Sequence, residues 1–289
     1  MKKLNSNSVV TLIRRKLWYL RAKYALSATM RKGEPPILVH QMGKVGSTSL
    51  ASELRKCSAL ALVYQTHFLS QQGFDEAIAV TEGWGRGESI HLKVSAQLMP
   101  YLDLPKREEK PWRVVTSVRD PVARQLSDAY QNPQVVGLPR GVTPDPLQVL
   151  EYLKQYFINF DETQDYACRW FQREIIDLLG VRVYESAFPV EQKYQILEQA
   201  GVRLLLFRVE DSEAVFNDKA AFNQWLGQSV DLNMSKANSA ADRASYESYK
   251  KVKADFKLPR EVLEKVYSTQ FARHFYGDRR EALIDSWSS

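Results

Sequence analysis

Short apolar runs alternate with amphipathic segments through most of the chain, and the alternation begins directly after Pro36. The runs hold five to seven residues, as buried strands do, whereas the segments between them space their apolar residues three or four apart, as helices do. Strands that alternate with helices predict a parallel sheet with helices on both faces. The predicted strands are residues 37–41, 60–65, 90–94, 113–118 and 203–209, and the predicted helices among them are 47–56 and 121–130.

The carboxyl-terminal part of the chain is mainly helical in pattern. No internal repeat or low-complexity tract interrupts it. We therefore predict a single α/β domain over residues 34–289, with a central parallel sheet flanked by helices and a helical C-terminal third. The helical segments are predicted at residues 146–160, 163–179, 212–225 and 243–287.

Residues 1–33 form a separate amphipathic arm. Apolar residues recur at helical spacing beside Arg14, Arg15 and Lys16, and Gly33 with the following prolines ends the pattern. Two interpretations stay open: a helix that packs on protein, which we favour, or a helix that rests on an anionic membrane surface. The apolar stripe consists of Val10, Ile13, Leu17, Leu20 and Tyr24.

The positive charge of the chain is concentrated in this arm. Nine of the 40 Lys and Arg residues lie in residues 1–33, which contain no acid, and the formal net charge of the whole chain is +6. The remaining 256 residues therefore hold 31 basic against 34 acidic side chains. A balance so close to neutral does not predict a nucleic-acid-binding surface.

Composition narrows the class of protein further. A chain of 289 residues that is 44% hydrophobic and 26% charged has enough apolar residues for a core, which excludes disorder and coiled coil. Only Cys57, Cys168 and four histidines are present, so we expect neither a disulfide framework nor a metal cluster. We find no signal-peptide pattern and no long apolar run, and expect a cytoplasmic protein, with peripheral contact at the inner membrane face if the arm binds lipid.

The segment from Ile37 to Leu50 has the pattern of an anion-binding loop. A predicted strand leads into two glycines, a lysine and three hydroxyl residues that open a helix. Glycines let the backbone bend around an anion, and the first N–H groups of a helix point at it. A plain glycine turn is the alternative. The predicted binding residues are Gly43, Lys44, Val45, Gly46, Ser47, Thr48 and Ser49.

The order of residues in this loop differs from a Walker A motif. That motif places Lys-Ser/Thr directly after the second glycine, whereas Lys44 precedes Gly46 by two residues. A nucleoside triphosphatase or P-loop nucleotide kinase is therefore disfavoured.

A second anion site is predicted after the strand at 113–118. Arg119 ends this strand, Asp120 is suited to cap the next helix, and Pro121 fits its first turn. Ser127 projects from the helix two turns later. An arginine fork and a serine hydroxyl are suited to phosphate; the alternative is a salt bridge at the strand end with an unrelated surface serine.

Together the two segments resemble the donor site of sulfotransferases that use 3′-phosphoadenosine 5′-phosphosulfate (PAPS). Lys44-x-Gly-Ser-Thr-Ser resembles the family's 5′-phosphosulfate loop, and Arg119-Asp-Pro with Ser127 eight residues after the arginine resembles its 3′-phosphate motif. The whole chain is most similar to bacterial capsular polysaccharide synthesis proteins and glycan O-sulfotransferases. The resemblance implies a P-loop-like sheet, PAPS as the sulfuryl donor and no metal.

The resemblance also implies a catalytic base. The segment Ile90–Pro100 resembles the one that carries the catalytic histidine in sulfotransferases, which makes His91 the first candidate, with Lys44 stabilising charge on the leaving phosphate. His67 is the competitor, because it follows the second predicted strand. His40 and His274 are expected to be structural.

A further phosphate contact in this family comes from a C-terminal loop. Lys236 and Arg243 lie in a polar stretch that suits this role, although a solvated loop explains them equally well. Tyr246 and Tyr249 are weaker candidates for packing near adenine.

The resemblance predicts an O-sulfotransferase acting on a glycan or glycolipid. The rival hypotheses are a nucleotide-binding scaffold of polysaccharide assembly and a nucleotide kinase. Specificity for the acceptor is expected in the loops 71–88 and 131–145, since connecting loops carry most binding contacts.

Overall fold

The computed structural model describes residues 20–57, 60, 62–85, 89–102, 110–230 and 246–289, with the side chain of Ser47 left aside. The candidate residues Lys236 and Arg243 lie outside this part of the chain.

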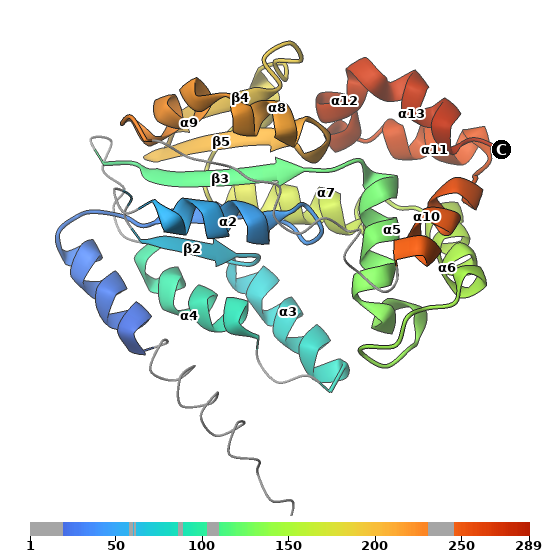
Figure 1. Cartoon of the computed structure of the whole chain (residues 1–289), viewed down its shortest axis with the longest axis horizontal. Helices are drawn as coiled ribbons and strands as arrows, with labels where there is room; N and C mark the ends of the chain where they lie inside the picture. Colours follow the sequence, from blue (N-terminus) through green and yellow to red (C-terminus); the bar gives the residue numbers. More distant parts are fainter. Residues whose placement is uncertain (1–19, 58–59, 61, 86–88, 103–109, 231–245) are drawn as a thin grey trace, which may run out of the picture.

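A five-stranded, mostly parallel sheet forms the centre of the fold (Figure 1). Its strand order is β2-β1-β3-β5-β4, and only β4 runs antiparallel to its neighbour. The predicted sheet flanked by helices is confirmed, but the sheet is mostly and not wholly parallel, because β4 pairs antiparallel with β5. The strands are β1 (Ile37–His40), β2 (Val63–Thr66), β3 (Trp112–Val118), β4 (Tyr194–Gln199) and β5 (Val202–Arg208).

Helices cover both faces of this sheet. Several begin at the capping residues expected of them: Ser70, Asp120, Asp145, Asp165 and Thr269 each accept a hydrogen bond from a backbone N–H of the first turn. The helices are α2 (Ser47–Lys56), α3 (Gln71–Gly83), α4 (Ile90–Leu102), α5 (Pro121–Gln131), α6 (Pro146–Ile158), α7 (Tyr166–Phe171), α8 (Ser212–Asn217), α9 (Lys219–Leu226), α10 (Tyr246–Asp255), α11 (Arg260–Tyr267), α12 (Gln270–Tyr276) and α13 (Arg280–Trp287), with a π-helical turn at Gln172–Asp177 and short 3₁₀ turns at Pro133–Val136, Val183–Glu185, Val209–Asp211 and Gly277–Arg279.

Alternate strand residues point to opposite faces and build two cores. Leu38 and Val114 pack with α4 and α7 on one face, whereas Val39 and Val115 pack with α2, α8 and α9 on the other. A third cluster joins α5, α6, α10, α11 and α13 beyond the carboxyl ends of the strands (Figure 1). This arrangement leaves the strand ends between the sheet and a helical bundle.

The described part of the N-terminal arm is a helix over residues 20–31 that packs on the sheet. Leu26 is fully buried in the first core, and Ala22 and Met30 pack against it. The hydroxyl of Tyr64 on β2 donates to the carbonyl of Ala22 at 2.9 Å. This part of the arm therefore packs on protein, as the favoured interpretation predicts. The predicted apolar stripe is wrong at Leu20 and Tyr24, whose side chains are 60% and 74% exposed.

Three sequence predictions differ from the structure. Residues 71–88, predicted as a loop, contain helix α3, whose first turn is capped by Ser70. Residues 90–94, predicted as a strand, form the first turns of α4, because the apolar pattern continues at helical spacing through Val94, Leu98 and Leu102. Strand β4 was not predicted, since it lies at the sheet edge and half of its residues are polar. Among the described residues, no helix has the length and apolar character to cross a membrane.

Shortening Leu26 to alanine tests the docking of the N-terminal helix. We expect Leu26→Ala to lower the free energy of unfolding by about 2–5 kcal/mol, because it removes fully buried methyl groups. The exposed Tyr24→Ala is the matched control and should change stability by less than about 0.5 kcal/mol. Urea unfolding of both variants provides the measurement, and equal stability of the two would show that this helix is not docked in solution.

Candidate functional site

The loop between β1 and α2 holds its backbone in an unusual conformation. Lys44 has φ 76°, a left-handed value that costs energy for a residue with a side chain, and Gly46 has φ 78°. Gly46, which has no side chain, is the N-cap of α2. The hydroxyl of Thr48 accepts a hydrogen bond from Gln65 at 3.4 Å. The first backbone N–H groups of α2 follow this loop, where a helix start favours an anion.

Arg119 lies beside this loop. Strands β1 and β3 are neighbours and parallel, so the segments that follow them meet at one edge of the sheet. One guanidinium nitrogen of Arg119 donates to the carbonyl of Lys44 at 3.0 Å, and the other donates to the hydroxyl of Tyr249 at 3.3 Å. Ser117, two residues earlier, donates to the carbonyl of Val45 at 3.1 Å. The two predicted anion-binding segments are therefore in direct contact.

Lys44 extends from the loop to the last turns of α5. Its ammonium donates to Gln131 Oε1 at 3.1 Å and lies 3.5 Å from Asp128 Oδ1. Ser127 precedes Asp128 on the same helix and is 7% exposed. Lys44 therefore contacts both Arg119 and α5, the helix that also carries Ser127.

Helix α7 supports the loop from its other side. The backbone N–H of Gly43 donates to the hydroxyl of Tyr166 at 3.3 Å. The guanidinium of Arg124 lies 4.5 Å from the centre of the Tyr166 ring, a distance at which cation–π attraction is favourable. Sequence analysis missed Tyr166 and Arg124, because their contacts depend on residues distant in the chain.

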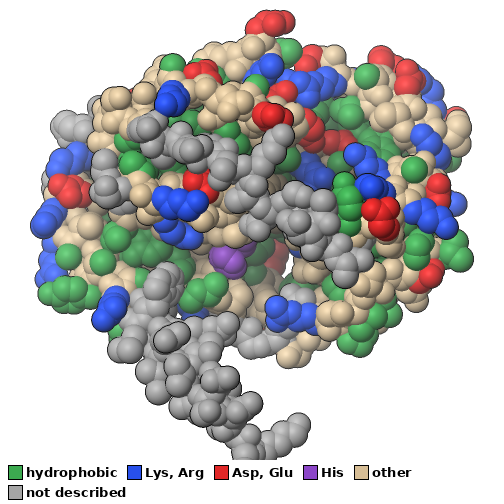
Figure 2. Space-filling view, viewed as in Figure 1, with side chains coloured by type: hydrophobic (Ala, Val, Ile, Leu, Met, Phe, Trp, Pro, Cys, Tyr) green, Lys and Arg blue, Asp and Glu red, His purple; other side chains and the backbone are tan. Residues whose placement is uncertain are grey.

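The two candidate bases form a pair next to the loop. The rings of His67 and His91 are edge-to-face with centroids 4.8 Å apart. His67 Nδ1 lies 2.6 Å from the carbonyl of Gln41. Because a carbonyl only accepts, Nδ1 carries the proton in the neutral ring and Nε2 keeps a lone pair. In Figure 2 a histidine side chain is visible at the rim of a hollow in the middle of this face, with Lys and Arg side chains on either side.

Burial favours the neutral form of both histidines. Desolvation, followed by the proximity of His91, lowers the pKa of His67 to about 4, and the charge of Lys44 contributes in the same direction. Burial also lowers the pKa of His91, with a smaller contribution from Arg55. Lys44 thus helps to lower the pKa of His67, whereas the cation that lowers the pKa of His91 is Arg55 on α2.

A buried carboxylate connects these elements. Glu174, on the π-helical turn, accepts hydrogen bonds from the backbone N–H groups of Leu69 and Ser70 at 2.7 and 3.0 Å. His40 Nε2 lies 3.4 Å from the same carboxylate. Burial would raise the pKa of Glu174, but the neighbouring His40 and these donors lower it below its ordinary value. Glu174 therefore fixes the segment between His67 and α3.

Asp120 anchors Arg119 to the helical bundle. As predicted it caps α5, accepting from the N–H of Ala123 at 3.0 Å, and it also accepts from Tyr267 and Trp287 at 2.5 and 3.2 Å. Its own N–H donates to Glu210 at 3.0 Å. Burial raises the pKa of Asp120, and the bond from Tyr267 partly offsets this. Asp120 and Glu210 thus fix the backbone next to Arg119 through hydrogen bonds.

Comparison with known proteins gives one match. Residues 148–277 match the sequence model of a family described as "Putative capsular polysaccharide synthesis protein". No curated protein and no solved structure matches the chain. Over these residues, which are less than half of the chain, the sequence is similar to that family. The match runs from α6 to the 3₁₀ turn after α12, so it includes Tyr166 and Glu174 but neither the loop nor Arg119.

Substitution of two glycines of α3 tests whether Glu174 packs against this helix. A Cβ on Gly73 would lie 2.2 Å from Glu174 Oε1, whereas a Cβ on Gly83 meets nothing within 4 Å. We expect Gly73→Ala to destabilise the protein by about 1–3 kcal/mol through overpacking. Gly83→Ala in the same helix should be neutral or stabilising by up to about 1 kcal/mol. Thermal unfolding measures both, and a neutral Gly73→Ala would mean that Glu174 does not hold α3.

Proposed function

We propose that this protein is a sulfotransferase of capsular polysaccharide synthesis, which moves a sulfuryl group from PAPS to a hydroxyl of a glycan or glycolipid. One observation supports this most strongly: Arg119 donates to the carbonyl of Lys44, so two cationic anion-binding segments meet at neighbouring strand ends. A donor with two separated phosphates needs two such sites side by side.

The residues present fit the donor. The start of α2, with the backbone N–H groups of residues 46–49, is suited to the 5′-phosphate, and Lys44 to the charge that develops on the leaving group. Arg119 and Ser127 are suited to the 3′-phosphate. Tyr249, bonded to Arg119 and packed at 5.7 Å on Tyr130, offers an aromatic surface for adenine. Lys236 and Arg243 remain proposed phosphate contacts.

Lys44 has to exchange partners during this reaction. Its ammonium now contacts Gln131 and Asp128, both on α5. The side chain is long enough to turn from these oxygens toward a phosphate bound at the start of α2, and Asp128 then keeps Arg124, 3.8 Å away, as a cationic partner.

The imidazole pair supplies the base. PAPS provides an activated sulfuryl group, the acceptor oxygen forms the new S–O bond, and the bond to the leaving phosphate breaks. The acceptor's O–H proton passes to an imidazole nitrogen. We propose Nε2 of His67 for this role, because its lone pair is oriented by the Nδ1 bond to Gln41 and Lys44 acts on the same ring. His91 remains the alternative that the family resemblance implies.

Arg119→Lys tests the donor site. Loss of the planar fork should weaken binding of 3′-phosphoadenosine 5′-phosphate (PAP) by about tenfold to a hundredfold, since a hydrogen bond to a charged group contributes about 1.5–3 kcal/mol. Affinity for adenosine 5′-phosphate, which lacks the 3′-phosphate, should be retained. Arg182→Ala, which removes an exposed arginine paired with Glu185, is the control.

Calorimetric titration of both nucleotides distinguishes the outcomes. Unchanged PAP affinity in Arg119→Lys would overturn the 3′-phosphate site. An equal loss for both nucleotides would mean that Arg119 only supports the loop. PAP binding without transfer of labelled sulfate to any glycan would favour the scaffold hypothesis.

The pH dependence of turnover tests the base. The base must be unprotonated, so wild-type kcat/KM should fall only as the pH approaches about 4, where His67 gains its proton. His67→Gln should lower turnover by about 100-fold or more while retaining PAP binding. His91→Gln should remain active with its acid limb displaced to higher pH, because His91 contributes to the low pKa of His67. If His91→Gln instead abolishes turnover, the base is His91.

A further inference from the structure

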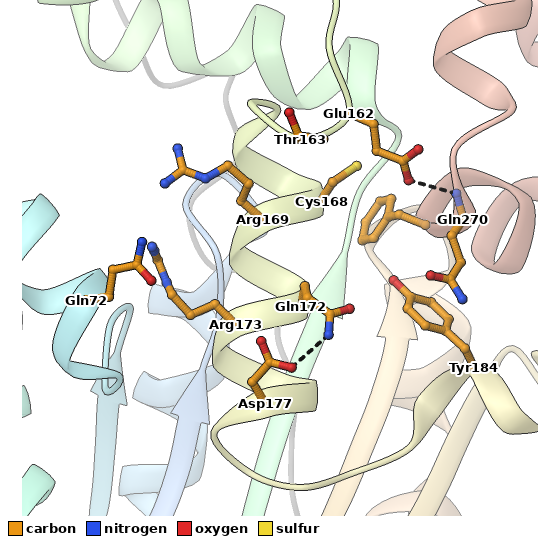
Figure 3. A pocket seen from close by; sticks show the side chains of 11 residues that line it. Gln72, Glu162, Thr163, Cys168, Arg169, Gln172, Arg173, Asp177, Tyr184 and Gln270 are labelled. Atoms are coloured by element: carbon orange, nitrogen blue, oxygen red, sulfur yellow. Dashed lines mark hydrogen bonds between the residues drawn. The ribbon is translucent and has the colours of Figure 1, made fainter.

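A polar groove lies over the outer face of α7 (Figure 3). Its floor is α7 with the π-helical turn that follows, and its volume is about 350 Å³. Arg169 and Arg173 point to one side, toward Gln72 on α3, and Gln172 points to the other, toward Gln270 on α12 (Figure 3). The lining residues are Gln72, Glu162, Thr163, Cys168, Arg169, Gln172, Arg173, Asp177, Tyr184, Gln270 and Phe271.

The groove offers hydrogen-bonding groups of both kinds without net charge. Two arginines and two carboxylates line it, and both arginines also bind Glu76, at 2.7 and 2.9 Å. Gln172 donates to Asp177 at 2.8 Å, which holds an amide and a carboxylate side by side. Each of these groups retains further donor or acceptor capacity. Such a lining suits a neutral molecule rich in hydroxyl groups better than an anion.

Tyr184 adds an aromatic edge to this lining. Its ring is half-buried and packs on His274 with a centroid distance of 5.0 Å, so its orientation is fixed. A fixed aromatic ring beside polar groups can contact the C–H face of a sugar while its hydroxyls find partners.

The backbone under the groove is itself unusual. Residues 172–177 form a π-helical turn, a rare conformation that occurs frequently at functional sites. The wider turn directs Glu174 into the core, while Gln172, Arg173 and Asp177 line the groove. One turn thus serves both the buried network and the outer surface.

The family match falls on this groove. Ten of the eleven lining residues lie within residues 148–277, all except Gln72, whereas the phosphate loop lies outside that range. The part of the chain that resembles proteins of polysaccharide synthesis is therefore the part that builds the groove.

The groove also lies close to the proposed transfer site. Trp170, the neighbour of Arg169 on α7, donates to the carbonyl of His67 at 2.5 Å. Tyr166, at the start of the same helix, contacts Gly43 of the loop. Helix α7 thus lies between the groove and the proposed transfer site and contacts both.

We infer that this groove binds a neutral saccharide unit of the acceptor glycan, apart from the unit that is sulfated. That the bound glycan is the acceptor rests on the proposed function. That the groove binds a saccharide rests only on the residues that line it. A chain held along α7 would present a neighbouring hydroxyl to His67 and Lys44 around the start of the helix.

Saccharide binding by the full chain tests this inference. The probes are tetrasaccharides of glucose and of N-acetylglucosamine, with a galacturonic acid tetrasaccharide as the anionic comparison, followed by saturation-transfer NMR and calorimetry. We expect a neutral probe to bind, and the double variant Gln172→Ala/Asp177→Ala to weaken its binding at least about tenfold. The matched control is Gln155→Ala/Glu151→Ala, which removes the same kind of exposed amide–carboxylate pair from α6 and should leave affinity unchanged.

Each outcome has a clear meaning. Equal affinity in wild type and groove variant, absence of binding by both neutral probes, or preference for the galacturonic acid probe would overturn the inference. PAP binding is measured on the same samples and should be the same in every variant. If the wild-type protein binds a saccharide probe but does not bind PAP, the proposed donor site alone is overturned.

Discussion

The hydrogen bond from Arg119 to the carbonyl of Lys44 joins the two halves of the site. It depends on the parallel pairing of β1 with β3, which places the segments after both strands at one edge of the sheet. Lys44 has a left-handed backbone conformation that its own preference disfavours, so the bond to its carbonyl is part of what holds the loop in shape. The proposed donor site depends on this contact.

Helix α7 connects the remaining parts. Tyr166 contacts the loop, Trp170 contacts the backbone at His67, and Glu174 on the following turn fixes the start of α3. These residues lie within the family match, whereas the loop does not. Helix α7 therefore contacts the loop and also forms the floor of the groove, so the proposed donor and acceptor sites share one structural element.

The sequence predicted the elements whose signals are local. Strands β1, β3 and β5 each contain a short apolar run, and the Lys44 and Arg119 segments are recognisable because their residues lie close together in the chain. The run at 90–94 is too short to distinguish strand from helix by itself. Partners such as Tyr166 and Glu174 could not be predicted, because they lie more than 100 residues from the groups they bind and no local pattern marks them.

The bond between Trp287 and Asp120 has a consequence for biosynthesis. The two residues are 167 positions apart, so Asp120 cannot gain this partner until nearly the whole described chain has left the ribosome. Contacts of such long sequence separation form late in folding. The adjacent Arg119 is therefore expected to acquire its final surroundings late, and a nascent chain that already contains the loop at Lys44 still lacks part of the proposed donor site.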